Sequence, residues 1–282
     1  MRLRERNFSA QDGLRLYYRD YGDPLSPRLP VLCLSGLTRN SKDYHKLASR
    51  LSEDRRVLCL DYRGRGRSEY DADWRNYVLS TYVRDIRHLL VTASVHRLAV
   101  IGTSLGGILG MALAVAMPGR LAGVVLNDIG PTIDRGGMQR IVAQMRAAEP
   151  QPDWESVIRK VAERVHWISP DDDAALSEMA RNTYREGDDG RFYPDWDMNL
   201  IKPLLRDRRP APDLWLMFRA LRQVPTRALR GALSDVLSAP TFDRMAAEKP
   251  DLVRVTVAGV GHAPSLQEPE AAQAIDAFLA GL

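Results

Sequence analysis

Six short apolar runs recur along the chain, and each is followed by polar or glycine-rich residues. They span 31–37, 56–62, 98–104, 121–128, 226–232 and 253–259. Continuous apolar runs of this length are typical of strands buried on both faces, which occur in parallel sheets covered by helices. Helical patterns separate most of the runs, as in 79–93, where Val83, Ile86, Leu89 and Leu90 recur at helical spacing. This alternation predicts a doubly wound α/β core.

Two other parts of the chain follow different patterns. Alternating segments on either side of Asp12-Gly13 predict an opening β-hairpin. Between 131 and 225 the apolar residues recur at helical spacing, and no strand pattern interrupts them. We therefore expect an α/β core of residues 1–130 and 226–282, with an all-helical insertion at 131–225.

Composition narrows the class of protein. The 282 residues are 45% hydrophobic and 27% charged, which is typical of a globular chain and argues against disorder. The net charge of +4 comes from scattered arginines such as Arg63, Arg65 and Arg67. A nucleic-acid-binding protein usually concentrates its positive charge on one face or arm, so we expect no nucleic-acid partner.

The cysteines and the apolar stretches indicate the cellular compartment in which we expect the protein. Cys33 and Cys59 both lie inside "VLCL" runs, where we expect free, buried thiols and no disulfide framework or metal site. Charges run through the first 22 residues, so no signal-peptide core is evident. Since no stretch reaches the roughly 18 apolar residues that span a membrane, we expect a cytoplasmic protein without a membrane partner.

The sharpest local signal is "VIGTSLGG", which leads from an apolar run into a helical pattern. A nucleophile at such a strand-to-helix turn needs neighbours without side chains, so that strand and helix can approach. Gly102 and Gly106 meet that need on either side of Ser104. We expect Ser104 to be a nucleophile, with the start of the following helix favouring nearby negative charge.

A serine hydroxyl needs a base to take its proton near neutral pH. The chain has five histidines. Four of them, His45, His88, His96 and His166, lie in patterns typical of surface or packing residues. His262 differs, because it lies in a glycine-rich loop directly after the last predicted strand, at the edge where catalytic groups gather in α/β sheets. We predict that His262 is the base.

A carboxylate after another strand would orient the imidazole and stabilise its protonated form. Asp235 follows the penultimate predicted strand, and the order Ser104, Asp235, His262 matches the Ser…Asp…His order of this architecture. Asp128, which follows the strand after the nucleophile, is the competing candidate, with a capping role as its alternative. We favour Asp235.

At this point the chain resembles a serine hydrolase of the α/β-hydrolase superfamily over nearly its whole length. The resemblance is carried by "GTSLGG", "LDYRGRGRS", "LSGLTRNSKDY", "RGALSD" and "GVGHAPSLQEPE". It implies an oxyanion hole formed by the backbone N–H groups of Leu37 and Leu105. It also implies that residues 61–68 brace the oxyanion loop and that residues 131–225 form a lid that shapes the pocket.

The expected activity is hydrolysis of a small-molecule carboxylic ester or lactone, without cofactor or metal, by a monomer or homodimer. Two alternatives stay open within this fold. One is a carbon–carbon bond or enol-lactone hydrolase of aromatic catabolism. The other is a small-molecule receptor without catalysis.

Overall fold

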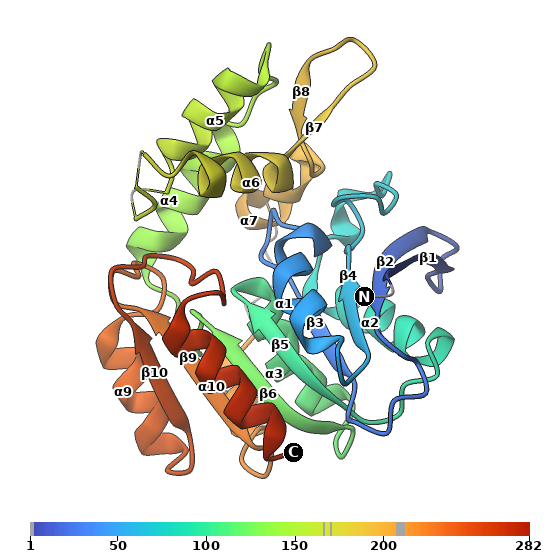
Figure 1. Cartoon of the computed structure of the whole chain (residues 1–282), viewed down its shortest axis with the longest axis vertical. Coiled ribbons are helices and arrows are strands. Elements are labelled where there is room, and N and C mark those ends of the chain that lie inside the picture. Colours follow the sequence, from blue (N-terminus) through green and yellow to red (C-terminus); the bar gives the residue numbers. More distant parts are fainter. Residues whose placement is uncertain (1–2, 166, 170, 207–211) are drawn as a thin grey trace.

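An eight-stranded sheet forms the centre of the molecule (Figure 1). The structure is a computed structural model, and it describes residues 3–165, 167–169, 171–206 and 212–282. The strand order is β1-β2-β4-β3-β5-β6-β9-β10. The strands are β1 (Leu3–Ser9), β2 (Arg15–Tyr21), β3 (Val31–Leu34), β4 (Val57–Leu60), β5 (Leu98–Thr103), β6 (Leu121–Asn127), β9 (Thr226–Gly231) and β10 (Val253–Val257).

The strand pairing follows the apolar pattern of the sequence. All six apolar runs are strands, and they pair in parallel from β4 to β10. The predicted hairpin is also confirmed, since β1 and β2 pair antiparallel. The expectation of burial on both faces is wrong for β10, where Val253 is half exposed. β10 is the last strand of the sheet, so it has a strand neighbour on one side only.

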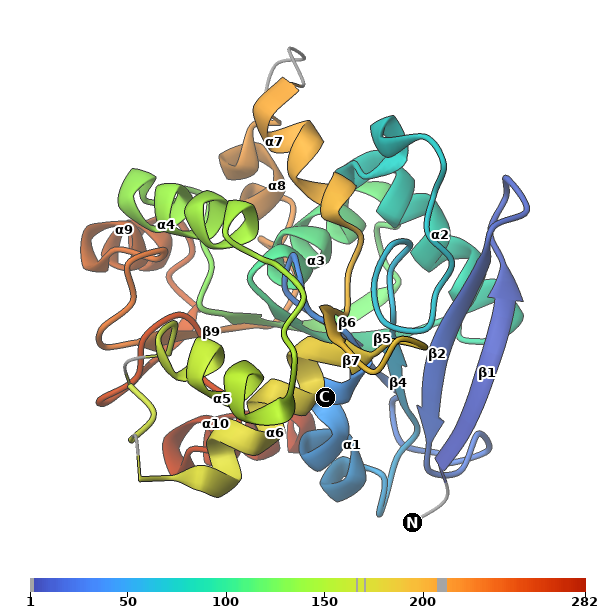
Figure 2. The ribbon, with the colours of Figure 1, turned by 90° about the horizontal axis from the view of Figure 1, so that it is seen from above.

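Helices cover both faces of the sheet, as a doubly wound core requires (Figures 1 and 2). Two separate apolar clusters lie on the two faces. The cluster on one face includes side chains of α1 (His45–Leu51) and α10 (Pro269–Ala280). The cluster on the other includes side chains of α2 (Leu79–Thr92), α3 (Leu105–Ala116) and α9 (Ala239–Glu248). Short 3₁₀ helices occur at η1 (Ser41–Tyr44) and η2 (Trp74–Asn76).

The segment between β6 and β9 lies at the end of the core where the parallel strands have their carboxyl termini (Figure 1). It contains α4 (Arg135–Arg146), α5 (Trp154–Ala162), α6 (Asp173–Thr183), β7 (Tyr184–Glu186), β8 (Phe192–Pro194), η3 (Met198–Leu200), α7 (Ile201–Arg206) and α8 (Leu214–Arg219). The expectation that this insertion is all helical is therefore wrong.

The missed element is the antiparallel hairpin of β7 and β8. Tyr184 and Phe192 anchor it, because both side chains are buried with Val157 and Val161 of α5. The sequence does hold a turn signal, "GDDG", between these two aromatic residues. The strands are only three residues long, so no alternation is visible in the sequence.

One side of the insertion is fixed to the core by buried polar contacts. Asn40 Nδ2 donates to Asp195 Oδ2 at 3.1 Å and to the carbonyl of Asn182 at 3.1 Å. Lys42 Nζ lies 2.9 Å from the same Asp195 carboxylate. Asp195 and Asn40 are almost fully buried, so these bonds join the end of α6 and the residues after β8 to η1.

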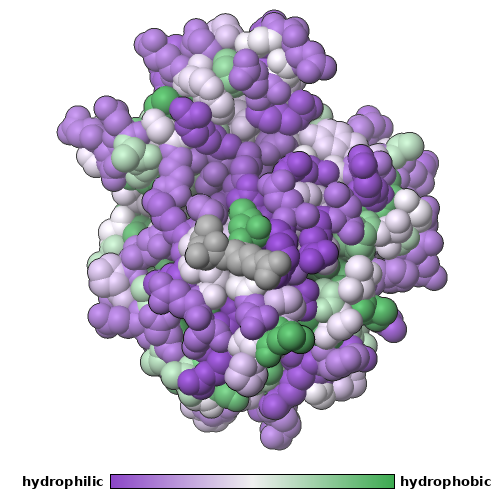
Figure 3. Space-filling view, turned by 45° about the vertical axis from the view of Figure 1, so that its right-hand side comes forward, coloured by the Kyte–Doolittle hydropathy of each residue, from purple (hydrophilic) through white to green (hydrophobic). Residues whose placement is uncertain are grey.

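Other features of the sequence are reflected in the fold. Cys33 and Cys59 are free and fully buried, as expected. Among the described residues, no helix is both long and apolar enough to cross a membrane. The face in Figure 3 is mainly hydrophilic, with hydrophobic residues in small separate groups. His166 lies outside the described residues.

Candidate active site

Ser104 lies in the turn between β5 and α3, with φ 53° and ψ −117°. A positive φ is costly for a residue with a side chain, and such strain is typical of functional turns. A Cβ at Gly102 would lie 2.3 Å from the backbone of Gly106, and one at Gly106 would lie 1.9 Å from the carbonyl oxygen of Leu34. Both glycines are therefore required for this turn, as the sequence predicted.

Ser104, His262 and Asp128 form one hydrogen-bonded series. Ser104 Oγ lies 3.0 Å from His262 Nε2, and His262 Nδ1 lies 2.7 Å from Asp128 Oδ2. A carboxylate oxygen only accepts, so His262 Nδ1 donates to Asp128 and Nε2 faces the serine. The predicted approach of His262 to Ser104 is thus present.

The expectation that Asp235 lies against the imidazole is wrong, and the competing candidate Asp128 lies there. Asp235 instead accepts from Arg140 of α4, with Nε–Oδ2 and Nη2–Oδ1 distances of 2.5 and 2.7 Å. This ion pair is partly exposed. The Arg140 hydrogen bond holds the pKa of Asp235 below its usual range, against the effect of burial.

The path of the His262 loop explains why Asp128, and not Asp235, contacts the imidazole. A Cβ at Gly231, the last residue of β9, would lie 2.5 Å from the carbonyl oxygens of both Val260 and Gly261. The loop after β10 therefore passes directly over the end of β9. It brings the imidazole to β6, the immediate neighbour of β5, which leads into Ser104. Asp128 follows β6 directly, and so its carboxylate meets the imidazole.

The Asp128 carboxylate is fully buried, and each oxygen has a donor besides the imidazole contact. The backbone N–H of Gly231 donates to Oδ1 at 2.8 Å, and Ser234 Oγ donates to Oδ2 at 2.6 Å. These hydrogen bonds satisfy the acceptor oxygens of a carboxylate that has no contact with solvent. Ser234 was missed by the sequence analysis, although it directly precedes Asp235.

The loop after β3, which includes Leu37, lies next to Ser104. A Cβ at Gly36 would lie 3.7 Å from Ser104 Cβ. Arg65, which is fully buried, donates from Nε to the Leu37 carbonyl at 2.8 Å. The Tyr62 hydroxyl donates to the Ser35 carbonyl at 3.1 Å. The predicted bracing of this loop by residues 61–68 is therefore present.

One aromatic residue of the insertion reaches the His262 loop. Carbon atoms of the Trp167 indole would lie 2.5–3.0 Å from a Cβ at Gly261, so the ring packs on the residue before His262. The side chain of His262 is 10% exposed. The sequence analysis did not identify Trp167 individually, because its helical context is equally typical of a core residue.

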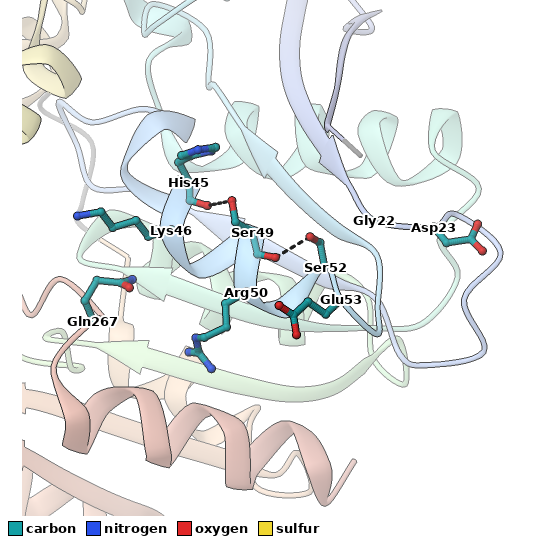
Figure 4. Close-up of a pocket in the computed structure, with 9 residues that line it drawn as sticks. All are labelled: Gly22, Asp23, His45, Lys46, Ser49, Arg50, Ser52, Glu53 and Gln267. Carbon is teal, nitrogen blue, oxygen red and sulfur yellow. Dashed lines mark hydrogen bonds between the residues drawn. The ribbon is translucent and has the colours of Figure 1, made fainter. Parts of the chain in front are cut away.

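The other described histidines lie elsewhere. His45 Nδ1 lies 3.1 Å from the hydroxyl of Tyr21, and His96 is exposed. His45 also borders a hollow beside α1 (Figure 4), which is lined by Gly22, Asp23, His45, Lys46, Ser49, Arg50, Ser52, Glu53 and Gln267. In it, Ser49 and Ser52 donate to backbone carbonyls, so neither serine has a base. Within the described ranges, no cluster of three or more His, Cys, Asp or Glu could hold a metal ion.

The mostly parallel sheet and the serine turn with its histidine contact are typical of the α/β-hydrolase class. The sequence model of the Alpha/beta hydrolase family matches residues 31–275, and the chain belongs to this family. A 3-hydroxybutyrate-oligomer hydrolase from Cupriavidus necator is 32% identical over 266 residues, covering 90% of this chain and 89% of the relative.

Two further relatives are similar over most of the chain. The crystal structure of an alpha/beta hydrolase from Novosphingobium aromaticivorans is 40% identical, with a TM-score of 0.92 and coverage of 99% of both chains. A 2-(acetamidomethylene)succinate hydrolase from Mesorhizobium japonicum is 27% identical over 241 residues, covering 85% of this chain and 84% of the relative. The family and its fold are thus as the sequence resemblance implied, and the chain is a hydrolase.

Proposed function

We propose that this hydrolase cleaves a small-molecule carboxylic ester or lactone through an acyl-enzyme on Ser104. His262 is the base, and Asp128 is the carboxylate that orients the imidazole. The observation that carries the proposal is the 3.0 Å approach of His262 Nε2 to Ser104 Oγ, opposite a 2.7 Å contact from Nδ1 to Asp128. A base within hydrogen-bond reach activates a serine, and a buried carboxylate stabilises the imidazolium that forms.

In the first half-reaction, Ser104 Oγ attacks the acyl carbon while its proton passes to His262 Nε2. The C–O bond to the alcohol then breaks, and the imidazolium returns that proton to the leaving oxygen. Water attacks the acyl-enzyme in the second half-reaction and gives one proton to His262. The free acid leaves as the proton returns to Ser104 Oγ. In a lactone, the leaving alcohol stays attached to the acyl group and departs with it.

The backbone N–H groups of Leu37 and Leu105 would donate to the oxyanion. Leu105 is the first residue of α3, and N–H groups of the first helical turn have no acceptor within the helix. The Leu37 loop is held by Arg65 from its carbonyl side. Each such donor is worth about a hundred- to a thousandfold in rate.

The insertion at 131–225 would act as the lid that bounds the substrate. Its Trp167 packs beside His262, and its Arg140 pairs with Asp235 after β9. The name of the Cupriavidus relative supports esters of hydroxy acids as the first substrates to test. An oligomer of a hydroxy acid is joined by ester bonds.

The test is turnover of p-nitrophenyl acetate by wild type and by Ser104→Ala. We expect a burst and steady turnover with wild type and neither with the variant. Ser94→Ala is the matched control, because Ser94 has the same φ of 53° but lies in the loop that leads into the opposite end of β5. It should keep full activity.

A substrate panel then separates the bond types. Linear hydroxy-acid dimers and trimers, lactones, enol-lactones, an N-acyl compound and a carbon–carbon substrate are compared by kcat/KM. Preference for an ester or lactone supports the proposal. If the correctly folded wild type turns over no member of the panel and is not labelled by fluorophosphonate at Ser104, the proposal is contradicted and the receptor alternative is favoured.

A further inference from the structure

A series of buried and partly buried hydrogen bonds lies next to Ser104 and His262. The Tyr44 hydroxyl contacts the Leu34 carbonyl at 2.7 Å and Thr103 Oγ1 at 2.9 Å. A carbonyl only accepts, so it takes the single proton of Tyr44. The Thr103 hydroxyl therefore donates to Tyr44. These hydrogen bonds therefore connect Leu34, at the end of β3, to Thr103, the residue before Ser104.

Asn127 continues this series to the His262 loop. Its Nδ2 donates to Thr103 Oγ1 at 3.0 Å and to the Pro264 carbonyl at 2.9 Å. The Pro264 carbonyl only accepts, so the atom of the Asn127 amide that faces it is Nδ2 and not Oδ1. Both protons of Nδ2 are thereby used.

The same residue also has a feature that stability alone does not explain. Asn127 is fully buried, and within the described part of the chain its Oδ1 has no hydrogen-bond partner. Leaving a buried polar atom unpaired costs about 1–3 kcal/mol. An apolar side chain here would avoid that cost but could not bridge Thr103 and Pro264.

We propose that Asn127 is a positioning residue that sets the separation of Ser104 and His262, an inference that rests on the proposed function. Its amide joins the residue before Ser104 to a residue two places after His262, and its own backbone continues into Asp128. In addition, the Ser104 N–H donates to the Asn127 carbonyl at 3.0 Å. The hydrogen bonds of the Asn127 side chain go to Thr103 and Pro264 rather than to the side chains of Ser104 and His262.

The consequence is a specific kinetic signature. A displacement of reacting groups by about 1 Å can cost about a hundredfold in rate. Loss of the bridge would therefore lower kcat and the rate of Ser104 acylation. KM would change little, because the Asn127 side chain is fully buried and offers no surface to a bound substrate.

The experiment compares Asn127→Ala, Thr103→Val and Thr103→Ser with wild type on p-nitrophenyl acetate, each at a temperature where circular dichroism shows it folded. Thr226→Val is the matched control. Thr226 is buried, and its hydroxyl donates to a backbone carbonyl at 2.8 Å, but it lies at the start of β9. The rate of fluorophosphonate labelling is measured in parallel.

We expect Asn127→Ala and Thr103→Val to lose about ten- to a hundredfold in kcat and labelling rate, with KM within about twofold. Thr103→Ser, which keeps the hydroxyl, should recover most of the loss. Thr226→Val should be destabilised like Thr103→Val yet keep its kcat.

Two outcomes overturn the inference while leaving the proposed function intact. One is an active wild type whose Thr103→Val variant keeps its kcat. The other is an equal loss of kcat in Thr226→Val, which would reduce the effect to general destabilisation. If Asn127→Ala does not fold, the three threonine variants still decide between these results. A wild type without turnover or labelling would instead contradict the proposed function.

Discussion

Nδ1 of His262 lies 2.7 Å from Oδ2 of Asp128, although the strands that precede these two residues, β10 and β6, are separated in the sheet by β9. The histidine loop follows β10 and the aspartate follows β6, so the contact spans β9. The close passage of Val260 and Gly261 over Gly231 makes this reach possible. Asp128 therefore contacts the imidazole whereas Asp235 pairs with Arg140, and substitutions at the two positions test this difference.

Asp128→Asn should lower kcat by about ten-thousandfold, because an amide can no longer hold the imidazole in the required tautomer. Asp235→Asn should leave kcat close to that of wild type, since Asp235 is paired with Arg140 instead. Both variants are compared by p-nitrophenyl acetate turnover and by thermal unfolding. A large loss in Asp235→Asn with a small loss in Asp128→Asn would contradict the assignment.

Gly106→Ala should destabilise the fold by at least about 1–3 kcal/mol and abolish activity, because its Cβ would lie 1.9 Å from the backbone oxygen of Leu34. Gly136→Ala is the control. Gly136 lies in the first turn of α4, where the nearest atom to a Cβ is an Asp134 carboxylate oxygen at 3.3 Å. Alanine there should be neutral or stabilising by up to about 1 kcal/mol. Equal urea-unfolding curves for the two variants would refute this.

Arg63→Met should destabilise the protein by about 3–5 kcal/mol, because it leaves the buried Asp85 carboxylate without its bidentate partner. Burial already raises the pKa of Asp85, against the opposing effect of Arg63. Without Arg63 that pKa rises further, so the folded variant binds a proton more tightly than the unfolded chain does.

The variant should therefore regain stability relative to wild type as the pH is lowered, and lose it as the pH rises through the folded-state pKa. Urea unfolding at several pH values measures the difference. Adding Asp85→Asn to Arg63→Met should restore part of the stability and remove most of this pH dependence. A deficit that does not change with pH would argue against an ionised, unpaired Asp85.

Trp167→Ala should raise KM for esters with bulky acyl groups by roughly tenfold, because the indole supplies apolar surface beside His262. Turnover of p-nitrophenyl acetate should change less. Trp154→Ala is the control, since that ring packs on Phe192 within the insertion, with centroids 4.4 Å apart. The same rise in KM for both variants would mean that Trp167 acts only through the stability of the insertion.

The sequence alone determined the layered α/β core, the six parallel strands and the turn that presents Ser104. These depend on local properties, namely runs of apolar residues, helical spacing and glycines at fixed offsets, which a chain carries whatever surrounds it. It also predicted that His262 lies near Ser104, because residues directly after the carboxyl ends of parallel strands gather at one edge of the sheet.

Only the tertiary structure decided which carboxylate meets the imidazole. Asp128 and Asp235 both follow core strands, so their sequence positions are equivalent. The choice depends on how far the His262 loop extends across the sheet and on Arg140, which binds Asp235 from a helix 95 residues away in the chain. The bridge through Asn127 likewise depends on contacts between distant segments, which leave no periodic trace in the sequence. The hairpin of β7 and β8 is local, but its strands of three residues are too short to show an alternation.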